Sequence, residues 1–417
     1  MLPNGAYQLD FVNRLAFNRL AGSPEELAAV RLIQDEIAAM GGESHTETFM
    51  IPRYTVTKQT AEITAPFSRT LEAAGVGFSG CTPPEGIEAP LHYAQTGTDI
   101  DLRGAAGKIV LLNGPRFEHW KELVASGALA FLISNGEGGA YDEDLTKTDL
   151  DRAYLRPHQL RHGRIPGLTI RPSAAIALLQ DGAERVRVTL AQEESECESR
   201  SVVAEIEGTD RASEIMVFTA HYDSVPFSRG AWDNASGCAD ILMLYHYFRE
   251  HRPRRSMRFV WCGAEERGLL GSKAYTEAHK DELSRFCFCL NIDMTGPALG
   301  YDLVHVTADA SLVSFLEYLS RERGFSLQVR HDVHSSDSTP FADAGVPAVG
   351  FKRAGCAAMH SRRDLPSPLS AAAFARTQDF LRVFAARLDA ASEFPVPRAI
   401  PPEIRGMIDR YFHRDEA

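Results

Sequence analysis

Short apolar runs alternate with helical periods through the second half of the chain. The runs lie at residues 215–220, 257–262, 286–292, 303–307 and 346–351. Runs of this length without a polar alternation are typical of strands buried on both faces, as in a parallel sheet. Between them, one helical face carries Ile241, Leu244, Tyr245 and Phe248. We therefore expect an α/β fold with a mostly parallel sheet covered by helices.

Two further helices carry local start and stop signals. The first has Ser23 as a candidate N-cap, Pro24 at the first helical position and Glu26 placed to complete a capping box. Its expected apolar face is Leu27, Val30, Ile33, Ile37 and Met40, and Gly41-Gly42 ends it. The second carries Leu312, Phe315, Leu316 and Leu319, with Asp309 as its cap and Gly324 as its stop.

The region between about residues 51 and 196 has a different pattern, because Gly and Pro interrupt it often. Apolar runs at 108–112 and 129–133 flank a candidate helix at 118–126. Strand, helix and strand within so few residues predict a small α/β module. The segment after residue 393 is rich in Pro and charge, and we expect it to pack loosely or to form a short terminal helix.

Composition and charge narrow the class of protein. The length of 417 residues allows two to three domains, and the 44% apolar content is ordinary for a globular chain. Lys plus Arg number 44 and Asp plus Glu number 56, so the net charge is 44 − 56 = −12. This acidic balance argues against a nucleic-acid or anionic-membrane partner. The sequence does not indicate an oligomeric state.

Cellular location is inferred from what the chain lacks. It contains no apolar run long enough for a transmembrane helix, and its first residues do not resemble a signal peptide. Seven cysteines, an odd number with no CxxC pair, fit reduced and partly buried thiols better than a disulfide framework. We therefore expect a cytoplasmic protein.

Residues that suit metal binding follow three of the predicted strands. His221 and Asp223 follow the first run, Glu265 and Glu266 the second, and Asp293 the third. In open α/β sheets, ligands bind at the carboxyl ends of the strands. Two more candidates, Asp233 and His360, lie in predicted loops. Two imidazoles with several carboxylates suit zinc, and the surplus of carboxylates suits two metals that share a bridge.

Each of these residues also has a plain structural explanation. His221 and Asp223 can cap a strand end, and Asp293 can simply terminate one. An adjacent Glu-Glu pair is usually solvated, Asp233-Asn234 is a common turn and helix cap, and a lone loop histidine is rarely a ligand. Their joint occurrence in this order at strand ends is what favours a metal site, with one glutamate as general base and its neighbour as a ligand.

With these residues placed, the chain resembles peptidase family M28, the zinc-dependent aminopeptidases and carboxypeptidases. The resemblance covers roughly residues 10–50 and 200–390. The block at 265–272 is its most specific part. The matching blocks are HYD at 221–223, DNASG at 233–237, EERGLLGS at 265–272, NIDM at 291–294 and MHS at 359–361.

The resemblance implies a phosphorylase/hydrolase-like mixed sheet with helices on both faces and a site for two Zn²⁺, with Co²⁺ or Mn²⁺ as alternatives. It implies His221 with Asp293 on one metal and Glu266 with His360 on the other. Asp233 would bridge the two metals, and Glu265 would be the general base. Asp223 would bond His221 and fix its tautomer.

The middle region resembles a protease-associated (PA) domain inserted into such a peptidase. The matching segments are 89–93, 107–111, 121–128 and 165–170. This resemblance implies a peptidase domain in two parts, residues 1–52 and 199–417, interrupted by a PA-type α/β domain at 53–198. In relatives that domain shapes the substrate cleft and supplies no catalytic group.

The late part of the chain departs from the family pattern. Relatives often use a tyrosine from this region to stabilise the tetrahedral oxyanion, but no tyrosine lies between Tyr318 and Tyr411. Ser338 also stands where relatives often carry His or Tyr. His334, Lys352 and Arg353 are the candidate donors, although a zinc alone can polarise a carbonyl. Lys352, Arg353, Arg362 and Arg363 form a basic cluster around His360, either as ordinary surface or as a site for a substrate carboxylate.

The expected activity is therefore that of a dizinc exopeptidase acting on a peptide or aminoacyl substrate. An aminopeptidase holds a free amine near carboxylates, which the acidic site favours, whereas the basic cluster keeps a carboxypeptidase or dipeptidase open. A glutaminyl-cyclase-like transferase with one zinc is a further alternative. A non-catalytic interaction protein is the last, and it would be expected to have lost ligands that this chain keeps.

Overall fold

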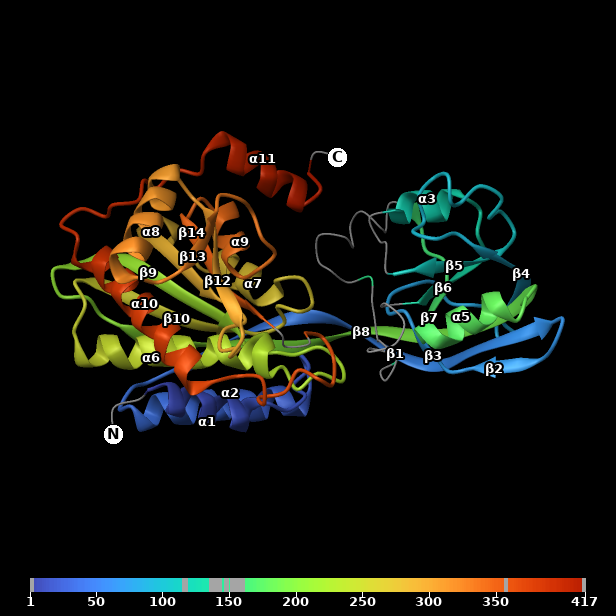
Figure 1. The fold of residues 1–417 in the computed structure, drawn as a ribbon, viewed down its shortest axis with the longest axis horizontal. Helices are drawn as coiled ribbons and strands as arrows, with labels where there is room; N and C mark the ends of the chain where they lie inside the picture. The colour runs from blue at the N-terminus through green and yellow to red at the C-terminus, as the bar shows by residue number, and fades with distance from the viewer. Residues whose placement is uncertain are drawn as a thin grey trace. The chain divides into compact units, whose positions relative to one another are not determined.

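The computed structural model describes residues 4–114, 119–134, 145, 150, 162–355 and 359–414. The chain divides into two compact units (Figure 1). Unit 1 is Met1–Ile51 with Glu198–Ala417, and unit 2 is Pro52–Cys197. Two long strands, β1 (His45–Ala65) and β8 (Arg185–Ile206), have residues in both units. No helix in the described ranges is both long and apolar enough to cross a membrane.

Unit 1 is built on a mixed sheet with the strand order β13-β12-β14-β11-β9-β10-β8. Its four central strands, β14, β11, β9 and β10, are parallel, whereas β8 and β12 run antiparallel to their neighbours β10 and β14. The strands are β9 (Arg211–His221), β10 (Arg255–Cys262), β11 (Phe286–Ile292), β12 (Gly300–Thr307), β13 (Leu327–Arg330) and β14 (Ala348–Gly355).

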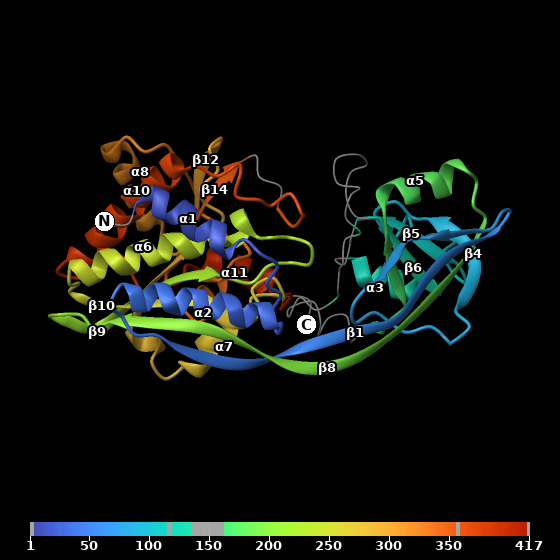
Figure 2. The ribbon, with the colours of Figure 1, turned by 90° about the horizontal axis from the view of Figure 1, so that it is seen from below.

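Helices cover both faces of this sheet. One face packs on α1, α2, α6, α8 and α10, and α1, α6 and α10 also contact one another (Figure 2). The other face packs on α7, α9 and α11. The helices are α1 (Gly5–Leu15), α2 (Pro24–Ala39), α6 (Ser236–Glu250), α7 (Leu270–Ala278), α8 (Ala310–Arg323), α9 (Ser338–Asp343), α10 (Ala371–Ala390) and α11 (Pro402–Tyr411), with short turns η2 (Ala231–Ala235) and η3 (Leu283–Arg285).

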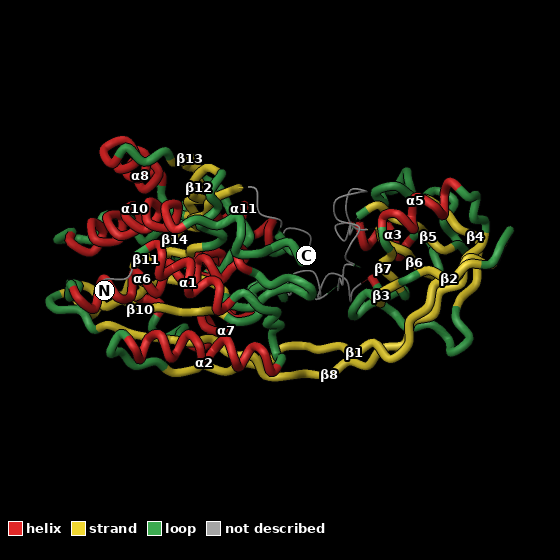
Figure 3. The backbone as a smooth tube through the Cα atoms, turned by 60° about the horizontal axis from the view of Figure 1, so that its bottom comes forward, coloured by secondary structure: helices red, strands yellow, loops and turns green. Residues whose placement is uncertain are grey.

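Unit 2 has its own sheet, in the order β8-β4-β5-β6-β7-β3, with β4 to β7 parallel. Figure 3 shows the strands of unit 2 together with its helices α3 and α5. The two helices pack on different faces of this sheet, in separate apolar clusters. The elements are β2 (Arg69–Leu71), which pairs with β1, β3 (Ala73–Gly75), β4 (Ile87–Tyr93), β5 (Ile109–Asn113), α3 (Trp120–Ala125), β6 (Ala130–Ser134), β7 (Gly167–Ile170) and α5 (Pro172–Gln180).

The fold class predicted from the apolar runs is confirmed. Each of the five runs in the second half lies in or overlaps one of the strands β9, β10, β11, β12 and β14. The α8 signals also hold, because the Asp309 carboxylate accepts a hydrogen bond from the Ser311 amide and Gly324 ends the helix with a φ of 59°. The two long strands β1 and β8 were not predicted, because much of each is exposed or half-buried and polar residues interrupt its apolar pattern.

Glu26 plays a different part from the one its capping position predicts. The Ser23 hydroxyl accepts a hydrogen bond from the Glu26 amide, as an N-cap should. The Glu26 carboxylate is fully buried, however, and accepts hydrogen bonds from the Gly22 amide at 3.0 Å and the Ser199 hydroxyl at 2.5 Å. Glu26 therefore ties the start of α2 to β8.

Candidate metal centre

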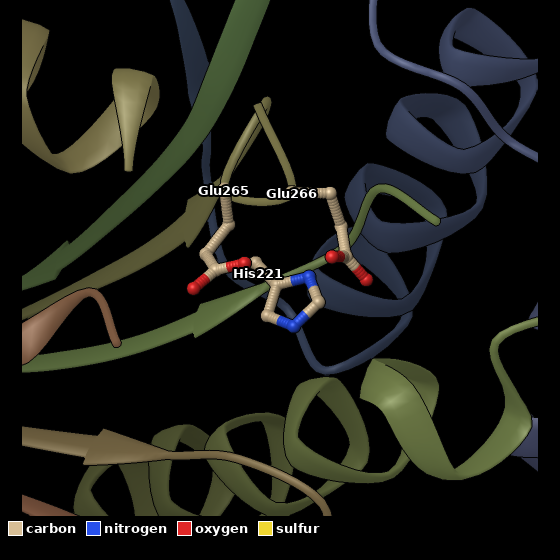
Figure 4. Close-up of side chains that lie close together, drawn as sticks. All are labelled: His221, Glu265 and Glu266. Carbon is tan, nitrogen blue, oxygen red and sulfur yellow. The ribbon is translucent and has the colours of Figure 1, made fainter. Parts of the chain in front are cut away.

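The carboxyl ends of three neighbouring parallel strands bring the predicted site residues to one edge of the unit 1 sheet. His221 is the last residue of β9, Glu265 and Glu266 lie in the loop after β10, and Asp293 directly follows β11. Figure 4 shows the two glutamates flanking the His221 imidazole. His360 reaches the same edge from a loop, and Asp233 reaches it from the short turn η2.

The nitrogen and oxygen atoms of these residues form two groups that share Asp233. The His221 Nε2 atom lies 3.0 Å from Asp233 Oδ1 and 3.5 Å from Asp293 Oδ1. The His360 Nε2 atom lies 3.0 Å from Asp233 Oδ2 and 3.1 Å from Glu266 Oε2. Each group is compact enough to hold a cation, with its ligand atoms within 4.8 Å of one another. The two oxygens of Asp233 therefore face different imidazoles, as a bridging carboxylate would.

The position of Glu265 is compatible with two roles, a metal ligand and a general base. Its carboxylate also groups with His221 and Glu266 within 4.8 Å, so distance alone allows it to be a ligand. Burial raises the pKa of Glu265 well above its usual range, and the neighbouring Glu266 and Asp337 charges raise it further against the lowering effect of His221. A half-buried carboxyl group that holds a proton readily is suited to general acid–base chemistry.

The two histidines show how strongly the site attracts positive charge. Burial alone would lower the pKa of His360, but Glu266 and Asp233 outweigh it and raise the pKa to about 11. The pKa of His221 is likewise raised well above its usual value, against the effect of burial, by Glu265 and the three aspartates around it. Divalent cations bound here would displace these protons.

The residues present fit zinc. Two imidazole nitrogens with carboxylate oxygens are a common zinc donor set. Among the described residues, Glu266 Oε1 and Asp293 Oδ1 are buried without a hydrogen-bond partner. Buried oxygens in that state are unfavourable unless a cation or another donor satisfies them.

Asp223 supports the loop that presents the glutamates. Its two carboxylate oxygens accept hydrogen bonds from the amides of Glu265 and Glu266 at 3.0 and 3.2 Å. Its distance to His221 Nδ1 is 3.5 Å, which is long for a hydrogen bond. The sequence-based expectation that Asp223 orients His221 remains a prediction, and the contacts add a second task for the same carboxylate.

The turn that carries Glu265 and Glu266 has a demanding backbone. Ala264 adopts a φ of 55°, and the Leu270 amide donates back to the Ala264 carbonyl. A Cβ atom on Gly271 would stand 2.2 Å from the Gly263 carbonyl oxygen, so α7 can approach this loop only with glycine there. The close approach explains the second glycine of the 265–272 block.

The Asp233 segment is held by side chains distant in sequence. The Asn234 side chain donates to the Ile292 carbonyl and accepts from the Met294 amide, which joins the segment to the end of β11. Asp364, fully buried, accepts hydrogen bonds from the amides of Trp232 at 2.7 Å and Asp233 at 3.1 Å. Sequence reasoning missed Asp364, and no local pattern distinguishes it.

Asp364→Ala should weaken zinc binding by about 10- to 100-fold, the usual effect of removing a group that orients a ligand. The reason is that two buried amides lose their acceptor, and the Asp233 carboxylate loses its fixed orientation. Competition with a chromophoric chelator measures the change. Asp364→Asn, which keeps one acceptor oxygen and the same volume, serves as the matched variant and should lose less. An affinity unchanged in Asp364→Ala would contradict this role.

Arg19 was also missed, and it holds the chain between His221 and Asp233. Its guanidinium is fully buried and donates to the backbone carbonyls of Tyr222, Arg229 and Gly230. Backbone carbonyls of this loop would otherwise be buried without partners. The loop between α1 and α2 therefore helps to position the site.

Comparisons with known proteins agree with this geometry. Residues 201–385 match the model of "Peptidase family M28". Carboxypeptidase Q of Bos taurus is 27% identical over 354 residues, which cover 80% of this chain and 73% of that protein. Aminopeptidase YwaD of Bacillus subtilis is 28% identical over 345 residues, covering 80% and 71%.

A solved structure shares the fold over nearly the whole chain. BSAP, a zinc aminopeptidase from Bacillus subtilis, matches with a TM-score of 0.78 and 24% identity, covering 97% of this chain and 99% of that one. Together, these findings show that residues 201–385 match peptidase family M28, and that the residues of the matching blocks cluster at one edge of the unit 1 sheet.

Proposed function

We propose that this protein is a zinc-dependent exopeptidase that binds two zinc ions and releases residues from the amino end of peptides. The observation that carries the proposal is the pair of three-residue groups that share Asp233. Two-metal hydrolases hold their ions roughly 3.5–4 Å apart, a spacing that one bridging carboxylate spans. His221 and Asp293 would hold one ion, and Glu266 and His360 the other.

The chain's own residues would then divide the chemistry as follows. Bound zinc lowers the pKa of water and polarises a carbonyl oxygen. Glu265 takes the proton from the attacking water and gives it to the leaving amine, and its raised pKa suits both transfers. The Asp223 carboxylate keeps Glu265 in place by accepting a hydrogen bond from the Glu265 backbone amide.

The direction of cleavage rests on charge. The site gathers the carboxylates of Asp233, Glu265, Glu266 and Asp293 within a small volume. Three of these would hold the metals, and the negative charge of the fourth, Glu265, favours a substrate ammonium group, which supports an aminopeptidase. The similarity to proteins named as a carboxypeptidase and as an aminopeptidase is compatible with either direction.

Purified protein tests the proposal. With added zinc it should bind about two equivalents and hydrolyse free aminoacyl substrates but not their N-blocked forms, and chelation should abolish the activity. Hydrolysis of N-blocked dipeptides alone would overturn the aminopeptidase direction. Cyclisation of N-terminal glutamine without hydrolysis would support the transferase alternative, and failure to bind zinc would support the non-catalytic one.

Two further proposals concern the rest of the chain. We propose that unit 2 is a PA-type module without a catalytic group, since every metal-binding group found among the described residues lies in unit 1.

We also propose a cytoplasmic location, supported by the six described cysteines, all of which are free thiols. Fractionation of the source cells tests the location.

A further inference from the structure

One lysine stands in the same row of the sheet as two of the candidate metal ligands. Thr219 of β9 pairs with Asn291 of β11, and Asn291 pairs with Gly350 of β14. Two residues further along these parallel strands come His221, Asp293 and Lys352, which point to the same face because side chains alternate along a strand. The Asp293 amide donates to the Phe351 carbonyl at 2.9 Å, so the ladder reaches this row. Lys352 is thus one strand, about 4.8 Å, beyond Asp293.

The structure separates Lys352 from the other members of the basic cluster. Arg353, its neighbour, points to the opposite face, is buried, and pairs with Asp302 at 2.8 Å. Arg362 and Arg363 are exposed. Lys352 is half-buried, and its ammonium group forms no ion pair with any carboxylate in the described part of the chain.

Lys352 is held in place by uncharged contacts instead. Its Nζ atom donates to His334 Nε2 at 3.0 Å. Burial and the nearby Lys352 charge lower the pKa of His334 to about 4, so this imidazole is neutral and accepts the bond. The His334 ring stacks on His305 with centroids 4.3 Å apart, and His305 Nδ1 lies 2.6 Å from an Asp332 oxygen. A neutral acceptor thus fixes the ammonium group, and no carboxylate among the described residues pairs with it directly.

A half-buried cation that makes no ion pair and lies beside a metal site favours an anionic ligand. A peptide substrate has two backbone groups that can carry negative charge. The terminal carboxylate is charged throughout, and the oxygen of the scissile carbonyl becomes charged during the reaction. In a dipeptide, the carboxylate carbon is three bonds from the scissile carbonyl carbon, within about 4 Å. A carboxylate so close to the acidic site needs a cation to offset repulsion from the aspartates and glutamates.

We propose that Lys352 binds the free α-carboxylate of the residue that follows the scissile bond, so that dipeptides are the preferred substrates. This inference rests on the proposed exopeptidase function and deepens it. An amino-end specificity and a carboxylate-binding lysine are compatible only when both ends of the substrate are close to the site. Lys352 thereby becomes a specificity-determining residue.

The test compares leucyl-alanine with leucyl-alaninamide, which lacks the carboxylate. In Lys352→Met, the kcat/KM for the acid relative to the amide should fall by about 10- to 100-fold, the effect of losing one charge-assisted hydrogen bond. Lys280→Met is the matched control, because it makes the same change at an exposed lysine that pairs with Glu277, and it should leave the ratio unchanged. Calorimetry in a Glu265→Gln background gives the Kd of each uncleaved compound, and the added Lys352→Met change should weaken binding of the acid alone.

Other results would overturn the inference. An equal loss of kcat/KM on the acid and the amide, with both Kd values unchanged, would make Lys352 an oxyanion donor. An unchanged ratio in an active Lys352→Met enzyme would exclude the carboxylate site while leaving the exopeptidase function intact. If the wild-type protein hydrolysed neither compound, the proposed function would fail, and the calorimetric comparison would still decide whether Lys352 binds the carboxylate.

Discussion

Glu265→Gln should lower kcat for peptide hydrolysis by about 10²- to 10⁴-fold while leaving the bound zinc in place. Glutamine keeps the shape of the side chain but cannot take a proton from water or return one to the leaving amine. The loss follows from the role proposed for Glu265, whose pKa burial raises well above the usual range. Steady-state kinetics and zinc analysis of the same preparation measure both quantities.

The zinc content separates the two readings of Glu265 that distance allows. If Glu265 were a ligand, as its grouping with His221 and Glu266 permits, the variant would lose metal along with activity. Glu277→Gln is the matched control, because Glu277 is an exposed residue of α7 that pairs with Lys280, and its replacement should leave kcat unchanged. Full activity in a zinc-loaded Glu265→Gln protein would refute the general-base assignment.

Asp233→Ala should have the largest effect on metal content. Its two oxygens face His221 and His360 separately, so one substitution removes a ligand from both groups. The bound zinc should fall from about two equivalents to well below one, and hydrolysis should disappear with it. Metal analysis after gel filtration in zinc-free buffer measures the loss.

His360→Ala provides the comparison for that prediction. His360 belongs to one group only, with Asp233 and Glu266, so its loss should spare the ion held by His221 and Asp293. About one equivalent of zinc should remain. Circular dichroism checks that both variants keep the native secondary structure. Retention of two zinc ions by Asp233→Ala would rule out the bridging role.

Much of the site could be predicted because its residues are adjacent to strong local signals. The runs ending near His221, Cys262 and Ile292 are buried strands whose apolar character is visible without any partner. Parallel strands present their carboxyl ends at one edge of the sheet. Metal-ligand residues that directly follow such strands must therefore lie near one another. The caps at Ser23 and Asp309 are equally local, since each acts on an amide within three residues.

The long strands β1 and β8 show where this reasoning stops. Both are exposed or half-buried over much of their length, and Pro52 in β1 and the polar stretch at 192–198 in β8 interrupt any simple period. Their extent follows from pairing with strands elsewhere in the chain, which no window of local sequence contains.

The sequence by itself determined which candidate ligands follow which buried strands. It therefore determined that a site rich in carboxylates and imidazoles would form at the ends of those strands. Only the tertiary structure decided that Asp364 and Arg19 hold the Asp233 segment, and that Lys352 faces the site while Arg353 pairs with Asp302. The reason is physical. Strand formation and capping depend on neighbours a few residues away. The buried hydrogen bonds and ion pairs named here join residues 51 to 210 positions apart, and only the packed chain brings those residues together.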